Sequence, residues 1–358
     1  MVLDDRNREK TLIGKKPNRE GVCNMLLSSD KNVKIEHEAV RNTAGWYYFT
    51  HQLLEITGLD AVELLDQMCT NTIYKTGVGR AKYTTILDED GLIIDDVIIF
   101  RMEENKFWLS TLHIGRSIKW LEAHKAGRDV AYRNITKEWD MYSVQGPRSR
   151  DLVNAVAEQH VDDMKFFSIT DNKIGGISVK IARSGYTGEK LGYEIYVNPS
   201  QKEVVENALS EKQDDFGALR VTEIDVMAYT LPTEKGFVLI TDICGCNPFE
   251  VGMDKTIGWE KNFTGKAALE AIKDQPLKRQ LIGLQVDDPE ARVYGGPKGA
   301  PITKNGELVG RVTKFTYGAT VGKNIGFALV DTEKASVGDR VILNNDTEAL
   351  LTERPILK

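Results

Sequence analysis

Hydrophobic and polar positions along the chain follow the periodicity of strands more often than that of helices. Asp90-Gly91 separates two β-branched runs, a pattern typical of a tight hairpin. Apolar, β-branched or aromatic runs predict strands at residues 46–49, 53–58, 83–87, 92–100, 106–111, 140–144, 177–182 and 193–197.

Helical spacing is clearest in one segment, where apolar residues recur every three or four positions at Ala61, Leu64, Leu65 and Met68. Asp60 precedes this segment as an expected N-cap. Further helices are expected at residues 35–41 and 115–124, and from a Ser200 cap through Leu209. Together with the strands, these helices predict an α+β fold.

The two ends of the chain differ from its middle. Residues 1–34 are polar and irregular and predict a surface arm. Residues 275–358 contain almost only short strands with glycine-bearing turns, including a hairpin at 304–307, and predict a separate C-terminal domain built as a small β-barrel or sandwich. Its strands are expected at residues 280–286, 310–316, 324–330 and 340–343.

Composition narrows the class of protein. The chain has 358 residues, 41% hydrophobic and 28% charged, as in a soluble globular protein of two or three domains. The longest apolar run, at residues 91–100, is far shorter than the roughly 18 to 20 residues of a membrane-spanning helix. Residues 1–16 are charged and lack the apolar core of a secretory signal. We therefore expect a cytoplasmic protein with no membrane partner.

The charge of the chain and the positions of its cysteines and histidines argue against nucleic-acid-binding and metal-binding proteins. The 47 basic and 53 acidic residues give a formal charge of −6, and no long basic block occurs, so nucleic acid is not an expected partner. The cysteines Cys23, Cys69, Cys244 and Cys246 are scattered, and the five histidines are dispersed. We expect buried thiols, with no metal site and no disulfide framework.

Two adjacent carboxylates, Asp95 and Asp96, interrupt an apolar strand. Neighbouring strand residues face opposite sides, so one carboxylate can point inward, where it must be hydrogen-bonded or meet a cationic ligand. The alternative is that both lie near a strand end and are solvated.

A second group of polar residues lies at 183–189, where two glycines flank Tyr186-Thr187 and indicate a tight turn that presents a tyrosine. Glu194 follows in a strand, framed by Tyr186, Tyr193 and Tyr196. Aromatic rings offer stacking surfaces, and a carboxylate can accept two parallel N–H bonds from an amino-pyrimidinone edge. The alternative is an ordinary hairpin with a solvated glutamate.

The same residues closely resemble a family signature. Residues 184–189 with Tyr193-Glu194-Ile195 are similar to the T-G-Y-T-G-E-x-G-[FY]-E-[IL] motif of the glycine-cleavage T-protein (aminomethyltransferase) superfamily. Further matching blocks follow in the same order, at residues 79–83, 90–96, 145–147, 247–252, 263–269, 310–313 and 322–325.

The resemblance implies a three-domain, folate-binding α+β fold with a C-terminal small β-barrel. Residues 35–150 and 151–274 would form the two parts of the folate-binding domain, followed by the barrel at 275–358. Tetrahydrofolate would be the cofactor, with its N5 accepting a one-carbon group. By position, Asp96 matches the catalytic aspartate and Glu194 the glutamate that binds the pterin, while Tyr83, Thr111 and Tyr186 would also line the cofactor.

Departures from the family pattern concern the donor. The family's G-x-R-D-x-x-R-x-E helix corresponds to residues 227–234, which contain no arginine. Aromatic residues can hold a cationic donor by cation–π attraction, and core packing is their alternative role. We expect Tyr48, His51 and Trp108 to bind the donor.

The resemblance thus implies a tetrahydrofolate-dependent one-carbon transferase. Our leading hypothesis is a demethylase that moves a methyl group from a methylated amine, sulfonium or methoxy compound to N5. The alternatives are the aminomethyltransferase of the glycine cleavage system and a non-catalytic folate-binding regulatory protein. Expected partners are a small methyl or aminomethyl donor and a carrier protein that delivers it.

Overall fold

The structure is a computed structural model that describes residues 31–49, 51–344 and 346–358. Helix α1 (Lys31–Asn42) opens the described part of the chain. Residues 31–34, predicted as the end of the arm, belong to this helix, and the rest of the predicted arm lies outside the described residues.

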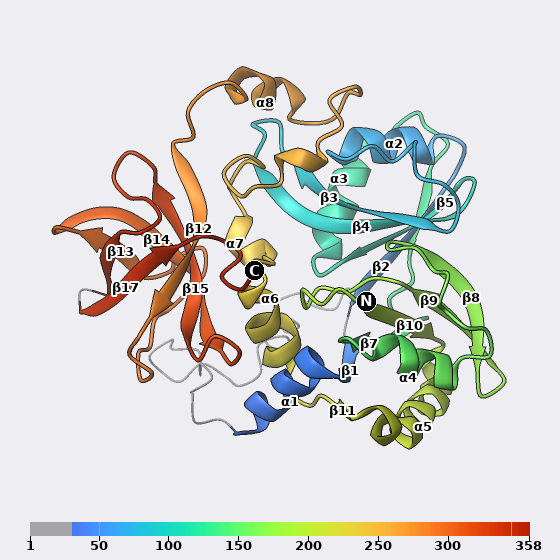
Figure 1. The fold of residues 1–358 in the computed structure, drawn as a ribbon. Coiled ribbons are helices and arrows are strands. Elements are labelled where there is room, and N and C mark those ends of the chain that lie inside the picture. Colours follow the sequence, from blue (N-terminus) through green and yellow to red (C-terminus); the bar gives the residue numbers. More distant parts are fainter. Residues whose placement is uncertain (1–30, 50, 345) are drawn as a thin grey trace.

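Two sheets form the larger part of the molecule, on the right of Figure 1. The first sheet has the order β11-β1-β7-β10-β9-β8, with β1 and β11 parallel and the other neighbours antiparallel. Its strands are β1 (Ala44–Phe49), β7 (Asp140–Gln145), β8 (Ile169–Ile174), β9 (Ile177–Ala182), β10 (Gly192–Val197) and β11 (Ala218–Arg220). The second sheet has the order β3-β4-β5-β2-β6. Its strands are β2 (Gln52–Thr57), β3 (Arg80–Leu87), β4 (Ile93–Glu103), β5 (Lys106–Thr111) and β6 (Ala131–Asn134).

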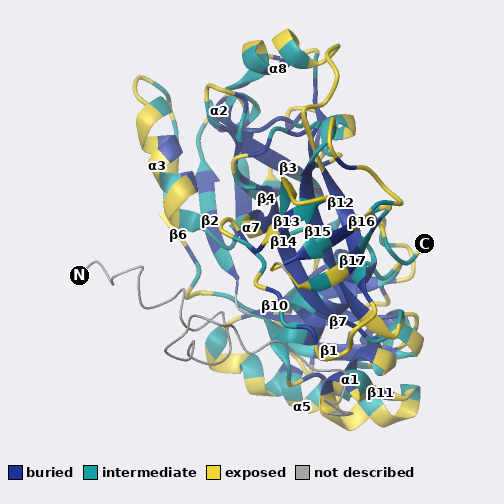
Figure 2. Ribbon diagram, turned by 90° about the vertical axis from the view of Figure 1, so that its left-hand side faces the viewer, coloured by how far each residue is buried: buried dark blue, intermediate teal, exposed yellow. Residues whose placement is uncertain are grey.

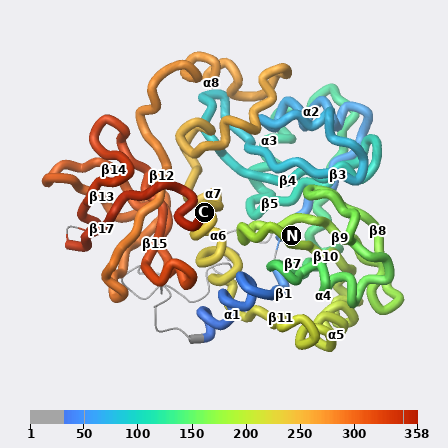
Figure 3. The backbone as a smooth tube through the Cα atoms, in the orientation of Figure 1, coloured from blue at the N-terminus to red at the C-terminus, as the bar shows by residue number. Residues whose placement is uncertain are grey.

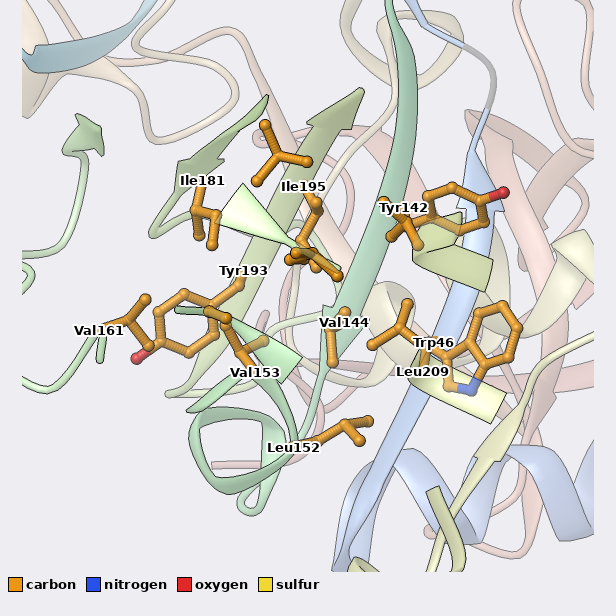
Figure 4. Packing of buried hydrophobic residues seen from close by; sticks show 14 of the residues in the cluster. Trp46, Tyr142, Val144, Leu152, Val153, Val161, Ile181, Tyr193, Ile195 and Leu209 are labelled. Carbon is orange, nitrogen blue, oxygen red and sulfur yellow. The ribbon is translucent and has the colours of Figure 1, made fainter. Parts of the chain in front are cut away.

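Helices cover the outer face of each sheet. Helices α4 (Ser149–Val156) and α5 (Lys202–Lys212) pack on the first sheet, through the apolar cluster drawn in Figure 4. Helices α2 (Ala61–Met68) and α3 (Ile114–His124) pack on the second. Each sheet therefore has its second face free to meet the other sheet.

The inner faces of the two sheets share a further apolar core. Alternation along β4 places Ile98 and Phe100 in this inner core, while Val97 and Ile99 face the helices of the second sheet. Tyr196 of β10 joins the inner core in the same way. Figure 2 shows buried strands running through the middle of the molecule, with exposed helices outside them.

A closed barrel with the order β12-β15-β14-β13-β16-β17 confirms the predicted C-terminal barrel. Its strands are β12 (Arg279–Val286), β13 (Pro301–Lys304), β14 (Glu307–Gly318), β15 (Lys323–Asp331), β16 (Arg340–Leu343) and β17 (Thr347–Thr352). The tube in Figure 3 shows the chain after β17 returning to the centre, beside α6 (Leu231–Glu234) and α7 (Ile240–Ile243). Other short elements are η2 (Pro199–Gln201), η3 (Gln213–Phe216), the π-helix η4 (Val226–Thr230), η5 (Asp254–Thr256) and α8 (Lys266–Ile272).

The predicted strands and helices are confirmed, but the sequence pattern did not reveal β6, β8, β11 or β17. The first three are sheet edges, where polar residues break the apolar pattern. The Ser200 cap is wrong: α5 begins at Lys202, and Asn198 accepts a hydrogen bond from the Ser200 N–H at 3.0 Å. Asp60 precedes α2 but makes no side-chain cap bond, since its carboxylate accepts from the Asp129 N–H.

Three of the four cysteines lie among the described residues. Cys69 and Cys246 are buried free thiols, Cys244 is a half-buried one, and Cys23 lies outside the described residues. Within the described ranges, no helix has the length and apolar character needed to cross a bilayer.

The helix-facing core of the first sheet supplies a stability test. Leu152 is completely buried there, whereas Leu59 is 72% exposed in a turn. We expect Leu152→Ala to lower the free energy of unfolding by about 2–5 kcal/mol, because it leaves a cavity. Leu59→Ala should change it by less than about 0.5 kcal/mol. Equal effects of the two substitutions in urea unfolding would contradict this packing.

Candidate active site between the two sheets

The candidate catalytic carboxylate, Asp96, lies on the inner face of β4, the face it shares with Ile98 and Phe100. Tyr83 of the neighbouring strand β3 donates its hydroxyl hydrogen bond to Asp96 Oδ2 at 2.9 Å. The Tyr83 ring lies 6.3 Å from the ring of Tyr186, which comes from the loop between β9 and β10. Asp96, Tyr83 and Tyr186 all keep part of their surface accessible, although the strands around them are mostly buried.

Asp95 points to the opposite face of β4, as strand alternation requires. It is only 1% exposed and accepts a hydrogen bond from Thr111 Oγ1 at 2.7 Å. The alternative in which both carboxylates are solvated is therefore wrong. Asp95 is thus hydrogen-bonded on the helix-facing side of β4, and Asp96 faces the space between the sheets.

Burial shifts the ionisation of both carboxylates. Burial and the negative charge of Asp96, opposed by the hydrogen bond from Thr111, together raise the pKa of Asp95 to about 7. Burial also raises the pKa of Asp96 to about 6, although the hydrogen bond from Tyr83 lowers it. A carboxyl group with a pKa of about 6 can both accept and release a proton close to neutral pH.

Glu194 faces the same inner space from β10 and is buried. Its Oε2 accepts hydrogen bonds from Ser184 Oγ at 2.7 Å and from the Tyr196 hydroxyl at 3.1 Å. Burial raises its pKa, and these two hydrogen bonds oppose that shift. Both bonds reach Oε2, and no described residue donates to Oε1. This second oxygen can therefore accept a hydrogen bond from a ligand. The alternative of a solvated hairpin glutamate is wrong.

Two buried polar atoms in this region have no hydrogen-bond partner among the described residues: the Tyr186 hydroxyl and His51 Nε2. His51 is 6% exposed, and its ring meets the Tyr196 ring edge-on at 5.3 Å. Burial lowers the pKa of His51 to about 4, so its imidazole is neutral at pH 7. Unpaired buried polar groups cost free energy unless a ligand or water satisfies them. A flat heterocycle with several N–H and C=O groups fits this set of residues.

The loop that carries Tyr186 is held by Gln145 at the end of β7. Gln145 Nε2 donates to the Ser184 carbonyl at 3.2 Å, and Thr187 Oγ1 donates to Gln145 Oε1 at 3.1 Å. A Cβ atom at Gly185 or Gly192 would lie 2.0 or 2.2 Å from Gln145 Oε1. These glycines therefore permit close packing around an amide side chain, which explains their spacing in the motif.

The barrel and α7 contribute a buried ion pair that the sequence did not reveal. Lys314 Nζ of β14 lies 2.9 Å from Asp242 Oδ2, and both side chains are at most 2% exposed. Asp242 raises the pKa of Asp96, and Lys314 lowers it. A lysine in the middle of a predicted barrel strand, next to Phe315, was the available signal, since such a residue needs a partner when buried.

Two predicted site residues, Tyr48 and Thr111, lie on the helix-facing sides of the sheets, whereas Trp108 belongs to the inner apolar core. Tyr48 faces the helices of the first sheet, where its hydroxyl donates to Asp140 Oδ1 at 2.7 Å. Thr111 bonds Asp95 on the helix-facing side. Trp108 is 3% exposed and packs between Trp139 and Tyr196, with ring centroids 5.0 and 6.1 Å away. Strand alternation and core packing explain these positions.

Among the residues that the structure describes, no three His, Cys, Asp or Glu side chains lie together as a metal site would require. The described side chains of the inner faces offer carboxylates, tyrosine hydroxyls and a neutral imidazole.

The fold is that of a known one-carbon transfer enzyme. Its architecture is shared with the glycine cleavage system aminomethyltransferase T from Bartonella henselae, with a TM-score of 0.80, 21% identity, and 98% of this chain and 96% of that chain covered. Residues 25–261 match the family described as the GCVT N-terminal domain, and residues 279–358 match the glycine cleavage T-protein C-terminal barrel domain.

Relatives extend the match over most of the chain. An aminomethyltransferase of Bacillus subtilis is 32% identical over 318 residues, covering 86% of this chain and 85% of the relative. One from Thermoanaerobacter sp. is 30% identical over 339 residues, covering 92% and 90%. The chain belongs to the glycine cleavage T-protein family. This confirms the predicted fold class and the enzyme class, a one-carbon transferase that depends on tetrahydrofolate.

The raised pKa of Asp95 predicts a pH dependence of stability. A carboxyl with a raised pKa in the folded state contributes stability below about pH 4, which is lost as the pH rises to about 7. We expect Asp95→Asn to remove this loss. The unfolding free energy of the variant should therefore increase relative to that of the parent as the pH rises from 4 to 8. The exposed Asp90→Asn is the control. Parallel stability curves for Asp95→Asn and the parent would contradict the assignment.

Proposed function

We propose that the chain is an aminomethyltransferase, which passes the one-carbon unit of an aminomethyl donor to tetrahydrofolate. Asp96 carries this proposal: a carboxylate with a pKa near 6, partly accessible between two sheets and bonded to Tyr83. The extended similarity to relatives named aminomethyltransferase supports this donor over a methylated one. By the same proposal, the donor arrives on a carrier protein.

The residues on the inner face have distinct proposed roles. Tetrahydrofolate, when bound, supplies the N5 nitrogen that takes the one-carbon unit. Glu194 Oε1 accepts N–H bonds from its flat ring system, and the rings of Tyr83 and Tyr186 flank it. His51 Nε2, neutral and unpaired, accepts a further hydrogen bond from the cofactor or the donor. We also propose that residues 35–150 and 151–274 form the two parts of the folate-binding domain, since the first sheet takes strands from both.

Asp96 acts through charge and proton transfer. Tyr83 occupies Oδ2, which leaves Oδ1 facing the reacting atoms. A carboxylate in a desolvated position stabilises positive charge that develops beside it and accepts a proton at Oδ1. The charged form is required for this role, so turnover should rise as the pH passes through about 6.

Demethylation is the second candidate, and one observation favours it. Residues 227–234, where the family pattern has arginines, instead pack Met227 and Leu231 into an apolar cluster with Val40 of α1. This segment therefore offers no guanidinium to a donor. A different donor end is compatible with a methylated amine, sulfonium or methoxy compound.

Product analysis separates these two candidates. Tetrahydrofolate is incubated with the enzyme and either an aminomethylated dihydrolipoyl donor or a panel of methylated amines, sulfonium and methoxy compounds. With the first donor we expect 5,10-methylenetetrahydrofolate, together with ammonia and the free dihydrolipoyl thiol as leaving groups. Formation of 5-methyltetrahydrofolate from a methylated donor, without the methylene product, would overturn the aminomethyltransferase proposal. Asp96→Asn should lower kcat by about 10²–10⁴-fold while cofactor binding persists; unchanged turnover would exclude Asp96 as the catalytic group.

Glu194→Gln tests the cofactor position. Replacing the carboxylate removes charge-assisted acceptance of N–H bonds, so the Kd for tetrahydrofolate should rise by about 10- to 100-fold in calorimetric titration. Glu206→Gln is a matched control, since Glu206 Oε2 accepts from the Tyr142 hydroxyl at 3.0 Å on the outer side of the same sheet. Equal Kd values for both variants would place the pterin elsewhere.

A further inference from the structure

Glu234, the last residue of α6, is completely buried and lies where three parts of the chain meet. Its Oε1 accepts the backbone N–H of Thr320 at 2.8 Å, in the turn between β14 and β15 of the barrel. Its Oε2 accepts from Arg41 of α1 at 2.8 Å and lies 3.2 Å from His37 Nε2. Glu234 thus joins the barrel to the N-terminal helix of the described chain.

Arg41 continues this connection to the loop of the candidate cofactor site. One of its terminal nitrogens bonds Glu234, and the other forms an ion pair with Glu189. Glu189 lies three positions after Tyr186 in the same loop. The guanidinium therefore bridges two carboxylates, one on the loop and one at the barrel contact.

Backbone packing supports the same arrangement independently. Gly188 has a φ of +81°, and a Cβ atom there would lie 2.2 Å from Cβ of Lys235. The loop thus lies directly against the residue that follows Glu234. Gln145 holds the start of the loop and Arg41 its end, so Tyr186 is presented between two fixed points.

Electrostatics keep Glu234 charged in this buried position. Burial by itself would raise its pKa, but the hydrogen bond and charge of His37 and the charge of Arg41 lower it to about 2. His37 is itself held, since its Nδ1 lies 2.9 Å from Thr230 Oγ1 and its Nε2 lies 2.9 Å from Thr320 Oγ1. Buried hydrogen-bond networks of this kind restrict their members to a narrow range of geometries.

We propose that Glu234 is a positioning residue that makes the geometry of the cofactor loop, residues 184–189, depend on contact with the barrel. Glu234 does not touch the reacting atoms and acts through Arg41 and Glu189. This inference rests on the proposed function, because it takes Tyr186 to contact tetrahydrofolate. Its consequence is that affinity for the cofactor responds to the contact between Glu234 and the barrel turn at Thr320.

The test compares Glu234→Gln with Glu250→Gln in the full chain. Glu250 is also a buried carboxylate that joins a loop to the barrel, through Arg279 of β12 at 2.8 Å, but it has no described contact with residues 184–189. For Glu234→Gln we expect faster amide hydrogen exchange at residues 185–189 and a rise of about tenfold in the Kd for tetrahydrofolate. The kcat at saturation should stay within about twofold, because Asp96 and Tyr83 are unchanged. Glu250→Gln should alter neither the exchange nor the Kd.

Other outcomes would contradict either the positioning role of Glu234 or the proposed role of Tyr186. If Glu234→Gln lowers the Tm but leaves loop exchange and Kd at parent values, its role is structural only and the inference is overturned. If loop exchange accelerates without a change in Kd, the loop does not hold the cofactor, and the proposed role of Tyr186 fails instead. Should Glu234→Gln not fold, Thr320→Val replaces it, since it removes the barrel hydroxyl that contacts His37 Nε2 and helps to lower the pKa of Glu234. Unchanged loop exchange in that variant would also overturn the inference.

Discussion

The alternation of side chains along a strand is the constraint on which the whole arrangement depends. Both sheets use one face to bury apolar residues under helices, and that leaves the other face of each to meet its counterpart. Residues one position apart, such as Asp95 and Asp96, consequently serve different parts of the molecule. A register slip of one residue in β4 would exchange their positions and remove the site.

The candidate site places carboxylates in largely buried surroundings. Asp96, Glu194 and Asp242 are carboxylates surrounded by protein, and burial raises the pKa of each. Every one of them has at least one described hydrogen-bond donor: Tyr83, Ser184 or Lys314. Electrostatic interactions are stronger in such surroundings than in water, so small changes in donor geometry have large effects on ionisation.

Strand and helix periodicity predicted most elements, because the core strands carry apolar residues that are visible in the sequence. Edge strands such as β6 and β8 escaped prediction since their polar residues interrupt that pattern. Family motifs pointed to Asp96, Tyr83, Tyr186 and Glu194, which the fold brings to the space between the two sheets. Tyr48 and Trp108 have the composition of a cation-binding site, but whether an aromatic residue faces a ligand or a core depends on strand orientation. Partners distant in sequence, such as Lys314 with Asp242, are set by the packing of the barrel, which no local pattern encodes.

The contacts of Glu234 also bear on how the protein assembles during synthesis. His37 and Thr320 are 283 positions apart in the chain, and their contact closes one of its long loops. A polypeptide synthesised only as far as residue 300 has both sheets but lacks the barrel turn that contributes the Thr320 N–H. Long-range contacts of this kind form late in folding. An unfinished chain therefore leaves Glu234 and His37 without their barrel partners. All of their contacts can form only after the barrel has folded.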